Sequence, residues 1–582
     1  MQRGRLLNAL GWVSFALACS AFLLPIVNPD IYWHLAAGKY ALAHLAPPRR
    51  DVFSWTMAGR RWTDFEWLSQ AVYYLLWLAG GWRALQLFKA LLLALTLLVF
   101  RRTVLLHGRR AALPLLLPFF ALGILSNCDL RPENFTLLFF AATFYFLEKR
   151  RLAGEDLKGP GAAAAFAFFA LWANLHAGFL YGLALAGIYA AGEFAEALLP
   201  YLRGRAPFRR PPAAADYLKV FAAGLAASFA TPYGWRVYSV VLNHARYSAA
   251  LSAHIREWAP FSPGDPYQWP YALALAGALG AVLFFALRRR RVVWHHAGTL
   301  LLFGWLSLSY GRNIPFFMIT APVCALALPW ASPGPRARRA LAWAAVPAAA
   351  LLLWFWAVFA LPQYSSAPRL DKWGSPGLAS FLRSEKKELS GLRLYNPWGW
   401  GGWLEWKLWP DYRTFMDGRY LFHGRIEEMA GLDVSAANWR RLTERYGFGL
   451  MLLKAGWPEV PVRQRLPDGS ERVFRRPAYL FYLPAADWAV VYWDRGSAAL
   501  VRRSAVRPDW LKAHELRYLR PGDLPSLEAP ALAGALPLSG LRRELGVFER
   551  SHPGDAALNS ELAGFVGGLE KLCSRKGAKC AE

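Results

Sequence analysis

The sequence predicts a polytopic α-helical membrane domain, followed by a small extracytoplasmic α/β domain and C-terminal helices. Three observations predict it: long apolar runs, arginine clusters between those runs, and ordinary polarity after about residue 360. The 582 residues are 55% hydrophobic and 15% aromatic, with a mean hydropathy of +0.20, which is high for a soluble protein. We therefore expect a transmembrane domain over 1–361, an α/β domain over 362–510 and a helical segment over 511–582.

The net charge of +28 does not indicate a nucleic-acid partner. Much of the excess lies in short arginine clusters between apolar runs, such as Arg288–Arg291. Membrane proteins mark their cytoplasmic loops in this way, so the charge indicates topology and a lipid bilayer as partner. The 28 tryptophans fit interfacial belts and sugar-stacking surfaces equally well.

The first apolar run, Leu6–Val27, follows Arg3 and Arg5 and is too long for a signal-peptide core. We expect it to be the first span, with a cytoplasmic N-terminus and a large outer loop over residues 28–83. Two amphipathic pieces of this loop, Ile31–Leu45 and Glu66–Gly80, are expected to be interfacial helices. Arg101-Arg102 ends the next run and should be cytoplasmic, so Glu66–Gly80 is not expected to cross.

The alternation of apolar runs and arginine clusters predicts eleven spans in a bacterial plasma membrane, with the C-terminal domain outside. Several runs are shorter than the roughly 20 residues of a full span, so their ends must recruit flanking polar residues. After 6–27, the predicted spans are 84–100, 111–126, 135–147, 162–175, 179–199, 218–230, 271–287, 299–310, 314–330 and 340–361.

The C-terminal part shows short β-type runs and helical patterns, which indicate a small α/β domain. The runs are Leu392–Tyr395, Tyr412–Met416, Phe448–Leu453, Tyr479–Leu483 and Trp488–Tyr492, with helices at Leu378–Leu389 and Ala436–Tyr446. Ser526–Leu545 and Asp555–Cys573 are typical of a helical hairpin. Cys573 and Cys580 either form a disulfide outside the cytoplasm or stay free thiols in the tail.

Ionisable residues crowd the outer loop beside the first span. Asp30 and His34 stand among tryptophan and tyrosine, and Asp64 and Glu66 open the second interfacial helix. Ionisable groups at membrane depth are costly and usually functional. The loop therefore indicates an enzyme that acts on a lipid-linked substrate at the membrane face.

The topology and this loop resemble the GT-C superfamily of membrane glycosyltransferases. The likeness is to the bacterial branch near protein O-mannosyltransferases and the aminoarabinose transferase, and Pro29-Asp30-Ile31-Tyr32 carries it. Phe65-Glu66-Trp67-Leu68 matches the glutamate of that family's second loop helix but lacks its lysine and prolines. The resemblance implies transfer of a sugar from a polyprenyl-phosphate carrier to an acceptor on the outer face.

Four further motifs resemble bacterial membrane proteins within or beside this superfamily that have no assigned role. They are Arg49-Arg50-Asp51-Val52-Phe53-Ser54-Trp55, Asn174-Leu175-His176-Ala177-Gly178, Gly311-Arg312-Asn313-Ile314-Pro315 and Met416-Asp417-Gly418-Arg419. A fold hosts many functions, so this likeness predicts the fold more strongly than the activity.

Sugar transfer to a hydroxyl or amine needs a base for the acceptor, and Asp30 is the candidate. Its alternative role is to cap the helix that follows. We expect the Glu66 carboxyl in the same cavity. No cofactor is required by the sequence; a divalent metal on Asp30, His34 and Glu66 is an alternative, and so is a histidine held by hydrogen bonds alone.

The departing phosphate needs cations, and Arg131 and Arg312 both stand at outer span ends, where arginine is scarce. The alternatives are snorkelling and an ion pair with Glu133. Lys89 lies inside the predicted span 84–100. It either replaces the missing family lysine or extends its amine to the membrane surface, as buried lysines often do. His176, at a sharp outer turn, is expected to face the same cavity.

Trp398 and Trp400 lie in a Gly/Trp-rich loop that either stacks on an acceptor sugar or packs as a turn on the membrane face. The leading function is a glycosyltransferase that uses a polyprenyl-phosphate-linked sugar and an envelope glycan, lipid or protein acceptor. The alternative is a non-catalytic lipid-binding or scaffold protein. A transporter is a third hypothesis, but no repeated, broken helices near the midplane favour it.

Overall fold

The structure is a computed structural model. It describes residues 2–330 and 374–575, except 154–160, 205–206, 208–210, 289–292, 433–434, 466–468, 470 and 533–535, and only scattered residues between 331 and 373. Most of the predicted last span, 340–361, and Cys580 therefore lie outside the described residues.

The chain forms two compact units. Unit 1 contains Met1–Arg49 and Trp62–Arg369, and unit 2 contains Arg50–Arg61 and Leu370–Glu582. The second unit therefore begins near the boundary expected at 361/362. The first outer loop, however, is not wholly part of the membrane domain as we expected, because its middle, residues 50–61, packs within unit 2.

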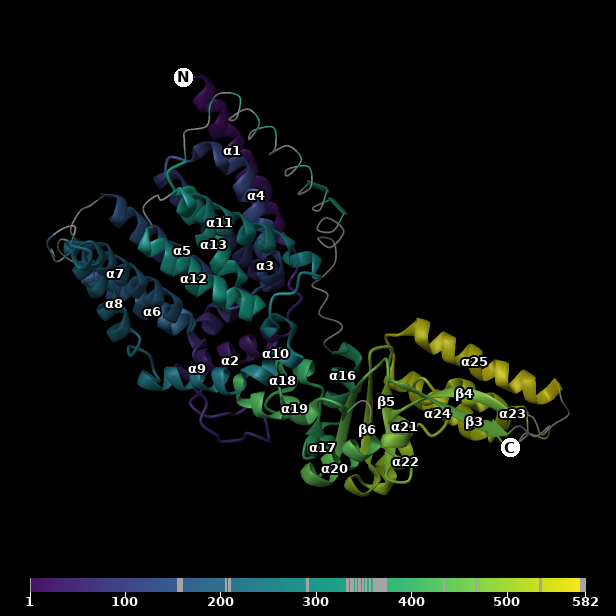
Figure 1. The fold of residues 1–582 in the computed structure, drawn as a ribbon. Helices are drawn as coiled ribbons and strands as arrows, with labels where there is room; N and C mark the ends of the chain where they lie inside the picture. The colour runs from purple at the N-terminus through teal and green to yellow at the C-terminus, as the bar shows by residue number, and fades with distance from the viewer. Residues whose placement is uncertain are drawn as a thin grey trace. The chain divides into compact units, whose positions relative to one another are not determined.

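Unit 1 is a helical bundle around an apolar core (Figure 1). Three of its described helices are long and apolar enough to cross a membrane: Trp67–Leu106, Phe179–Leu202 and Pro266–Leu287. The count of eleven spans stays a prediction. The bundle contains α1 (Gln2–Ser20), α3 (Trp67–Leu106), α4 (Leu113–Ile124), α5 (Glu133–Ala153), α6 (Gly161–Leu175), α7 (Phe179–Leu202), α8 (Pro212–Ala227), α11 (Trp269–Leu287), α12 (Trp294–Ser309) and α13 (Ile314–Leu326).

The helix α3 is broken where the sequence predicts the end of an interfacial helix. Gly80 and Gly81 have non-helical backbone angles, and Gly81 has φ 57°, which is the left-handed region that favours glycine. The segment before this break corresponds to the predicted interfacial helix Glu66–Gly80, and the segment after it to the predicted span. The break is confirmed.

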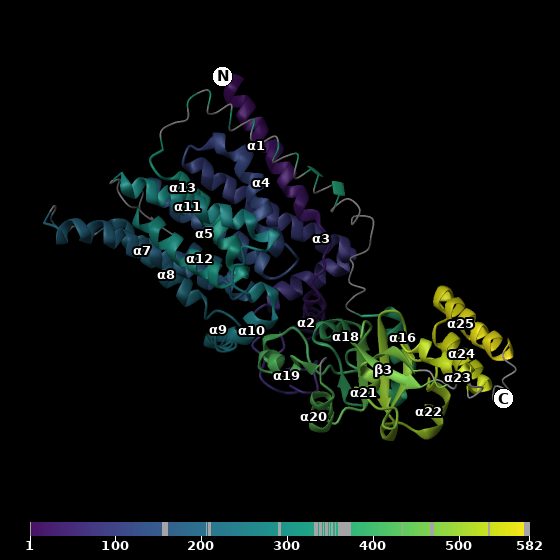
Figure 2. The same cartoon turned by 45° about the vertical axis from the view of Figure 1, so that its right-hand side comes forward.

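The other interfacial helix, predicted as Ile31–Leu45, is α2 (Asp30–His44). It crosses α3 closely at Gly38, because a Cβ added there would lie 2.1 Å from the carbonyl oxygen of Gln70. Both views place α2 at the same end of the bundle as the short helices α9 (Val237–Arg246) and α10 (Ser248–His254) (Figures 1 and 2). Asp30 and His34, which α2 carries, therefore lie at this end of unit 1.

A separate buried network ties together the ends of other helices in this unit. The Glu148 carboxylate of α5 accepts two hydrogen bonds of 3.0 Å from Arg151 and lies 2.9 Å from the His107 Nε2 and 3.0 Å from the His296 Nε2. Tyr189 of α7 donates to it at 2.5 Å. With its carboxylate shared among so many partners, Glu148 links α3, α5, α7 and α12.

Unit 2 has a four-stranded mixed sheet in the order β1-β2-β6-β5, with β1 parallel to β2 and the other pairs antiparallel. Its strands are β1 (Leu394–Tyr395), β2 (Leu450–Lys454), β5 (Trp488–Trp493) and β6 (Ser497–Arg502). Nearly every residue of these strands is buried, as in a sheet covered on both faces. A small α/β domain, as the sequence predicts, is therefore present.

Several predictions of local structure in unit 2 are right and two are wrong. The predicted strands at 392–395, 448–453 and 488–492 correspond to β1, β2 and β5. Tyr479–Tyr482 is instead the helix α21, and Thr414 makes only an isolated bridge, to Ser54. β6 and the separate hairpin of β3 (Glu459–Arg465) and β4 (Glu471–Pro477) were not predicted, because charged residues interrupt the apolar signal of that hairpin.

Helices complete unit 2. They are α16 (Pro376–Ser384), α17 (Lys386–Leu389), α18 (Gly401–Leu408), α19 (Ile426–Met429), α20 (Ala436–Tyr446), α21, α22 (Pro508–His514), α23 (Glu528–Leu532), α24 (Leu538–Ser551) and α25 (Ala556–Arg575). The predicted helix Asp555–Cys573 corresponds to α25, but Ser526–Leu545 is not one helix, because α23 ends at Leu532 and α24 begins at Leu538 after the non-helical residues 536–537. α24 and α25 pack together. Cys573 of α25 is disulfide-bonded, and the other member of the predicted pair, Cys580, lies outside the described residues.

Candidate functional site

Asp30 is the first residue of α2, and the turn before it is held by other side chains. Asp129 accepts hydrogen bonds from the backbone N–H groups of Val27 (3.0 Å) and Asn28 (2.6 Å). The Asn28 side chain in turn accepts from the Asp30 N–H at 2.8 Å. Asp30 lies inside α2, after the N-cap Pro29, so it does not occupy the N-cap position of the alternative role. A carboxylate in the first turn still interacts favourably with the helix dipole.

The second part of the loop, Asp64 to Glu66, is fixed by hydrogen bonds to its own helix. Asp64 is buried and accepts a 2.6 Å hydrogen bond from the Gln70 side chain. Two residues early in α3 bind the end of α6: Trp67 donates to the Asn174 side chain at 2.9 Å, and Ser69 donates to the Leu175 carbonyl at 2.7 Å. This anchors Glu66 directly before α3, next to the turn that carries His176.

His176 is oriented by two donors to the same ring nitrogen. Gly178 N–H donates to the His176 Nδ1 at 3.1 Å, and Thr136 Oγ1 lies 2.8 Å from it. Thr136 already accepts from Trp172 Nε1 at 2.8 Å, so its own hydroxyl hydrogen is available for the histidine. An Nδ1 that accepts twice leaves the ring hydrogen on Nε2, the nitrogen that lies 3.7 Å from Glu66.

Glu66 sits in an environment that disfavours its charge. Burial, followed by the neighbouring carboxyls of Asp64 and Asp30, raises the pKa of Glu66 well above its usual value, and Arg312 only partly opposes this. The pKa of His176 is lowered to about 3 by burial and then by Arg312. The surroundings therefore favour the protonated form of the Glu66 carboxyl and the uncharged ring of His176.

The two arginines predicted for phosphate binding both reach this cluster, but they differ in how firmly they are paired. Arg131 forms a close ion pair with Glu257, which raises the arginine pKa against the effect of burial. Arg312 is 3.6 Å from Glu133 and lies over the Trp258 ring, 4.6 Å from its centroid. Arg312 is thus the more loosely held guanidinium.

His34 of α2 is buried in the same region. Burial, then the charge of Arg131, lowers the pKa of His34 well below its usual value, so the ring is neutral. Its Nδ1 has no hydrogen-bond partner among the described residues, and His34 stays close to Trp33, with ring centroids 3.7 Å apart. Within the described part of the chain, no three His, Cys, Asp or Glu side chains are grouped to hold a metal ion, and this includes Asp30, His34 and Glu66.

The structure thus brings together residues from six separated segments of unit 1. Each member interacts with at least one other through a contact or a charge that perturbs its titration. We call this the outer-loop cluster: Asp30, His34, Asp64, Glu66, Arg131, Glu133, His176, Glu257 and Arg312.

Lys89 was expected to join the phosphate site, but its contact lies elsewhere. It is buried within α3 and donates to the Leu24 carbonyl at 2.5 Å, just after α1. That bond satisfies an orphan carbonyl at the end of α1 and η1 (Ala21–Leu23). No described contact joins Lys89 to the outer-loop cluster, and its role as the replacement for the missing family lysine stays a prediction.

Trp400 does not have the surface that sugar stacking requires. Its ring is 1% exposed within unit 2, and Trp398 is half-buried and packs against the core of that unit. The Gly-rich turn explains this, because a Cβ at Gly401 would lie 2.2 Å from the Met416 carbonyl oxygen. The loop is a tightly packed turn, and the stacking role of Trp400 is wrong.

Glu257, Trp258 and His244 were missed by the sequence reasoning. Glu257 pairs with Arg131, and the Trp258 ring stacks on that of His244, with centroids 5.5 Å apart at 18°. Burial lowers the pKa of His244 to about 4. In the sequence, Glu257 stands between Arg256 and Trp258 in the loop that joins the predicted spans 218–230 and 271–287. Many surface loops have such a pattern, so it did not single out these residues.

Chemically, the outer-loop cluster pairs a candidate base with cations and a protonated carboxyl. Asp30 offers a carboxylate, Arg131 and Arg312 offer guanidinium groups, and Glu66 offers a hydrogen-bond donor when it holds its proton. Neutral histidines nearby do not add charge. Such an arrangement suits an anionic leaving group beside an acceptor that must lose a proton.

No family model matches this chain, and no curated protein sequence matches it. Among solved structures, it is similar to the Archaeoglobus fulgidus oligosaccharyltransferase in its apo form, at a TM-score of 0.52 and 12% identity, covering 96% of this chain and 86% of the other. The complex of AglB from the same organism with an inhibitory peptide and a dolichol-phosphate also has a TM-score of 0.52 at 12% identity, with coverage of 100% and 87%.

A further similarity, to ArnT from Cupriavidus metallidurans bound to undecaprenyl phosphate, covers 87% of this chain and 99% of that one at 14% identity. Its TM-score is 0.43, and no conclusion is drawn from it. The similarity to the Archaeoglobus fulgidus oligosaccharyltransferase shows that this chain shares the fold of that protein. Within the described residues, three helices are long and apolar enough to cross a membrane.

Proposed function

We propose that the protein is a membrane glycosyltransferase that moves a sugar from a polyprenyl-phosphate carrier to an acceptor on the outer face of the membrane. One observation carries the proposal: Asp30, Glu66, Arg131 and Arg312, which come from distant parts of the chain, interact electrostatically in a single, partly buried cluster. Strongly perturbed ionisable groups gathered in one place are characteristic of functional sites.

In the proposed reaction, the acceptor hydroxyl or amine attacks the anomeric carbon of the sugar. The Asp30 carboxylate takes the acceptor proton, the bond between the anomeric carbon and the phosphate oxygen breaks, and the electron pair leaves with the polyprenyl phosphate. The new bond joins the acceptor oxygen or nitrogen to the same carbon. No oxidant, reductant or nucleotide sugar takes part.

Arg312 is the better candidate for the departing phosphate. Its ion pair with Glu133 is long, at 3.6 Å, whereas Arg131 is closely paired with Glu257. A phosphate can therefore draw Arg312 away from its partner at a smaller electrostatic cost, and a guanidinium grips phosphate with parallel hydrogen bonds. Glu66, holding its proton, would donate a further hydrogen bond to the sugar or the phosphate.

The test is turnover by the full chain in lipid nanodiscs. The donors are polyprenyl-monophosphate-linked hexoses and pentoses with labelled sugar, and the acceptors are envelope glycans, lipids and proteins extracted from bacterial membranes. We expect release of polyprenyl phosphate with at least one donor. Asp30→Asn should lower that release by about 10²–10⁴-fold, the usual contribution of a general base.

Asp265→Asn is the matched control, because Asp265 is also a carboxylate of an outer loop and pairs with Arg256 at 2.9 Å, outside the cluster. It should retain turnover. Binding of polyprenyl phosphate without release from any donor would overturn the enzymatic proposal. It would support the non-catalytic lipid-binding alternative instead.

A further inference from the structure

We call residues 50–61 the clip. They belong to unit 2, whereas the residues on either side, Arg49 and Trp62, belong to unit 1 and are hydrogen-bonded to each other. Trp62 N–H donates to the Arg49 carbonyl at 3.0 Å, and Arg50 and Arg61 form an antiparallel bridge. Asp51 extends this pairing, because its N–H donates to the Arg60 carbonyl at 2.8 Å. The clip is therefore a compact loop with adjoining ends, not a loose connection.

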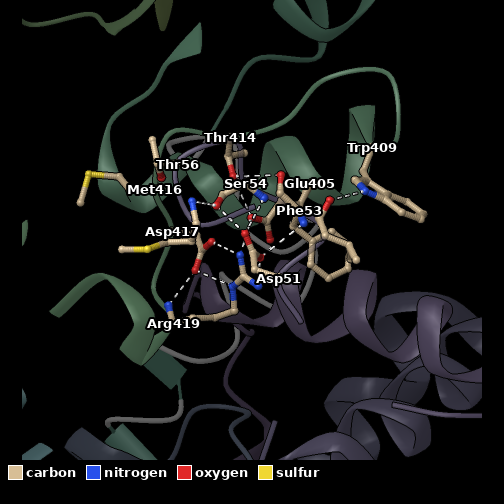
Figure 3. Close-up of polar contacts among 12 residues, drawn as sticks. Asp51, Phe53, Ser54, Thr56, Glu405, Trp409, Thr414, Met416, Asp417 and Arg419 are labelled. Atoms are coloured by element: carbon tan, nitrogen blue, oxygen red, sulfur yellow. Dashed lines mark hydrogen bonds and ion pairs between the residues drawn. The ribbon is translucent and has the colours of Figure 1, made fainter. Parts of the chain in front are cut away.

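The Asp51 carboxylate organises the clip and also binds unit 2. Its Oδ2 accepts from the Ser54 N–H at 3.1 Å and from the Ser54 hydroxyl at 2.5 Å. Its Oδ1 accepts from the Arg419 Nη1 at 2.7 Å (Figure 3). One buried carboxylate thus determines both the shape of the clip and its attachment.

Each nitrogen of the Arg419 guanidinium contacts a carboxyl oxygen. Asp417 accepts from its Nε at 2.9 Å and from its Nη2 at 2.5 Å, and Glu405 lies 3.4 Å from Nη2 (Figure 3). The side chains of these ion pairs are 0–1% exposed. Removing one partner of such a buried pair leaves an uncompensated charge, so the attachment is strong while it is intact.

Backbone and aromatic contacts add to the attachment. Trp55 N–H donates to the Thr414 carbonyl at 3.0 Å, and Thr414 N–H donates to the Phe53 carbonyl at 3.1 Å. The Trp55 indole also donates to the Leu394 carbonyl of β1 at 2.9 Å. The clip therefore packs into unit 2 as an integral part of its core.

The position of the clip in the chain links this attachment to the outer-loop cluster. Its base at Arg49 follows the last residue of α2, His44, by five residues, and its other end at Trp62 precedes Glu66 by four. A long free loop carries a conformational entropy that opposes a single arrangement of its ends. Anchoring the middle leaves only two short arms.

We infer that Asp51 and Arg419 are positioning residues that hold the Asp64–Glu66 turn, and the end of α2, in the arrangement needed at the outer-loop cluster. The effect on turnover rests on the proposed glycosyltransferase function. The effect on the arms of the loop does not, because it can be measured without a donor.

The test compares Asp51→Asn with the wild type in nanodiscs by amide hydrogen exchange and by turnover. We expect exchange to accelerate in residues 45–49 and 62–66, with the sheet strands β2, β5 and β6 unchanged. We expect kcat to fall about tenfold, since misplacement of reacting groups by about 1 Å costs up to 10²-fold. KM for the donor should change little, because Arg312 is untouched.

A rescue variant separates positioning from general stability. Ser54 and Thr414 form an isolated parallel bridge. Bridged backbones lie about 4.8 Å apart, which is within the usual Cα span of a disulfide, so we choose Ser54→Cys with Thr414→Cys. In the Asp51→Asn background, oxidation should restore both slow exchange and kcat, and a reductant should reverse the rescue.

Asp523→Asn is the matched control within unit 2, because it loses an ion pair of 2.6 Å with Arg476 but leaves the clip intact. It should leave exchange at 62–66 unchanged. If Asp51→Asn leaves 45–49 and 62–66 as protected as in the wild type, or exposes the sheet equally, the clip proposal is wrong. If the arms loosen as expected but the wild type shows no turnover, the glycosyltransferase proposal fails and the clip proposal stands.

Discussion

The outer-loop cluster of unit 1 and the Arg419 network of unit 2 both contain arginines and carboxyls, but the two clusters differ in the distances between these groups and in their exposure. In the Arg419 network, contacts to the guanidinium run from 2.5 to 3.4 Å and the side chains are 0–1% exposed. In the outer-loop cluster, Glu66 and His176 are 3.7 Å apart, Arg312 and Glu133 are 3.6 Å apart, and these side chains are 10–20% exposed.

The difference indicates which of the two clusters can accept a substrate. Arg419 has its donors committed to carboxyls at short distance, so a ligand would have to break buried ion pairs. Arg312 and Glu66 have long, incompletely formed contacts that a phosphate or sugar hydroxyl can replace. Catalytic contacts are commonly long in the free enzyme and shorten when the substrate binds.

The largest expected effect is on the stability of unit 2. Arg419→Met should lower the free energy of opening of the β1-β2-β6-β5 sheet by about 3–5 kcal/mol, because it leaves buried carboxyls without their cation. Amide hydrogen exchange of the full chain measures it. Arg495→Met is the control: its pair with Glu561 is 64% and 65% exposed, and such pairs contribute about 0–1 kcal/mol. Equal effects of the two variants would contradict the comparison.

The second effect is on binding of the phosphate. Arg312→Ala should weaken binding of polyprenyl monophosphate by about 10- to 100-fold, which corresponds to the 1.5–3 kcal/mol of a charged hydrogen bond, and Arg312→Lys should recover only part of it. Titration of the lipid into nanodiscs measures the affinity. Arg256→Ala, which removes an exposed arginine of the same outer region, should bind as the wild type does. Unchanged affinity in Arg312→Ala would move the phosphate to Arg131 or out of the cluster.

The third effect concerns the proton on Glu66. Burial, Asp64 and Asp30 raise the pKa of Glu66, so the surroundings favour the protonated carboxyl, which glutamine imitates. Glu66→Gln should keep turnover within about threefold of the wild type near pH 6.5, whereas Glu66→Ala should lose about tenfold with the hydrogen bond. If glutamine is as damaging as alanine, Glu66 acts in its ionised form.

The smallest expected effect is a change in how the stability of the folded protein depends on pH. Burial and Asp417 raise the pKa of Glu405 well above its usual value, so the folded state holds this proton more tightly than the unfolded chain does. The contribution to stability is therefore full below the unfolded pKa of about 4.3 and is lost as the pH rises through the folded pKa. Glu405→Gln cannot lose a proton.

Its Tm in nanodiscs should accordingly fall less than that of the wild type between pH 5 and pH 8. Groups that do not interact with Glu405 titrate identically in both proteins, so the difference between the two curves reports Glu405 and the neighbouring carboxyls Asp417 and Asp51. Parallel curves would mean that Glu405 is ionised in the folded protein throughout this range.

Local elements were predictable where a local cause dominates. The break at Gly80-Gly81, the helix after Pro29 and the helix Ala436–Tyr446 follow from glycine, helix initiation and amphipathic spacing. The run Tyr479–Leu483 was misread as a strand, since a short aromatic stretch has no distinctive period and its surroundings decide between helix and strand.

The candidate site was predictable as a set of residues but not as a set of pairs. Acidic residues in the first outer loop and two arginines at outer span ends break the rules for membrane proteins, and those rules are local. That Arg131 pairs with Glu257 rather than Glu133, and that Lys89 binds the Leu24 carbonyl, depends on how distant helices pack.

By itself, the sequence determined a membrane domain with a charged first outer loop and a soluble α/β domain after it, because hydropathy and charge act along the chain. Only the tertiary structure decided that residues 50–61 belong to the second unit, where Asp51 meets Arg419. Those residues are 368 positions apart, and neither carries a local signal of the other. Burial of charge is favourable only when partners meet, so their pairing is a property of the folded chain rather than of either segment.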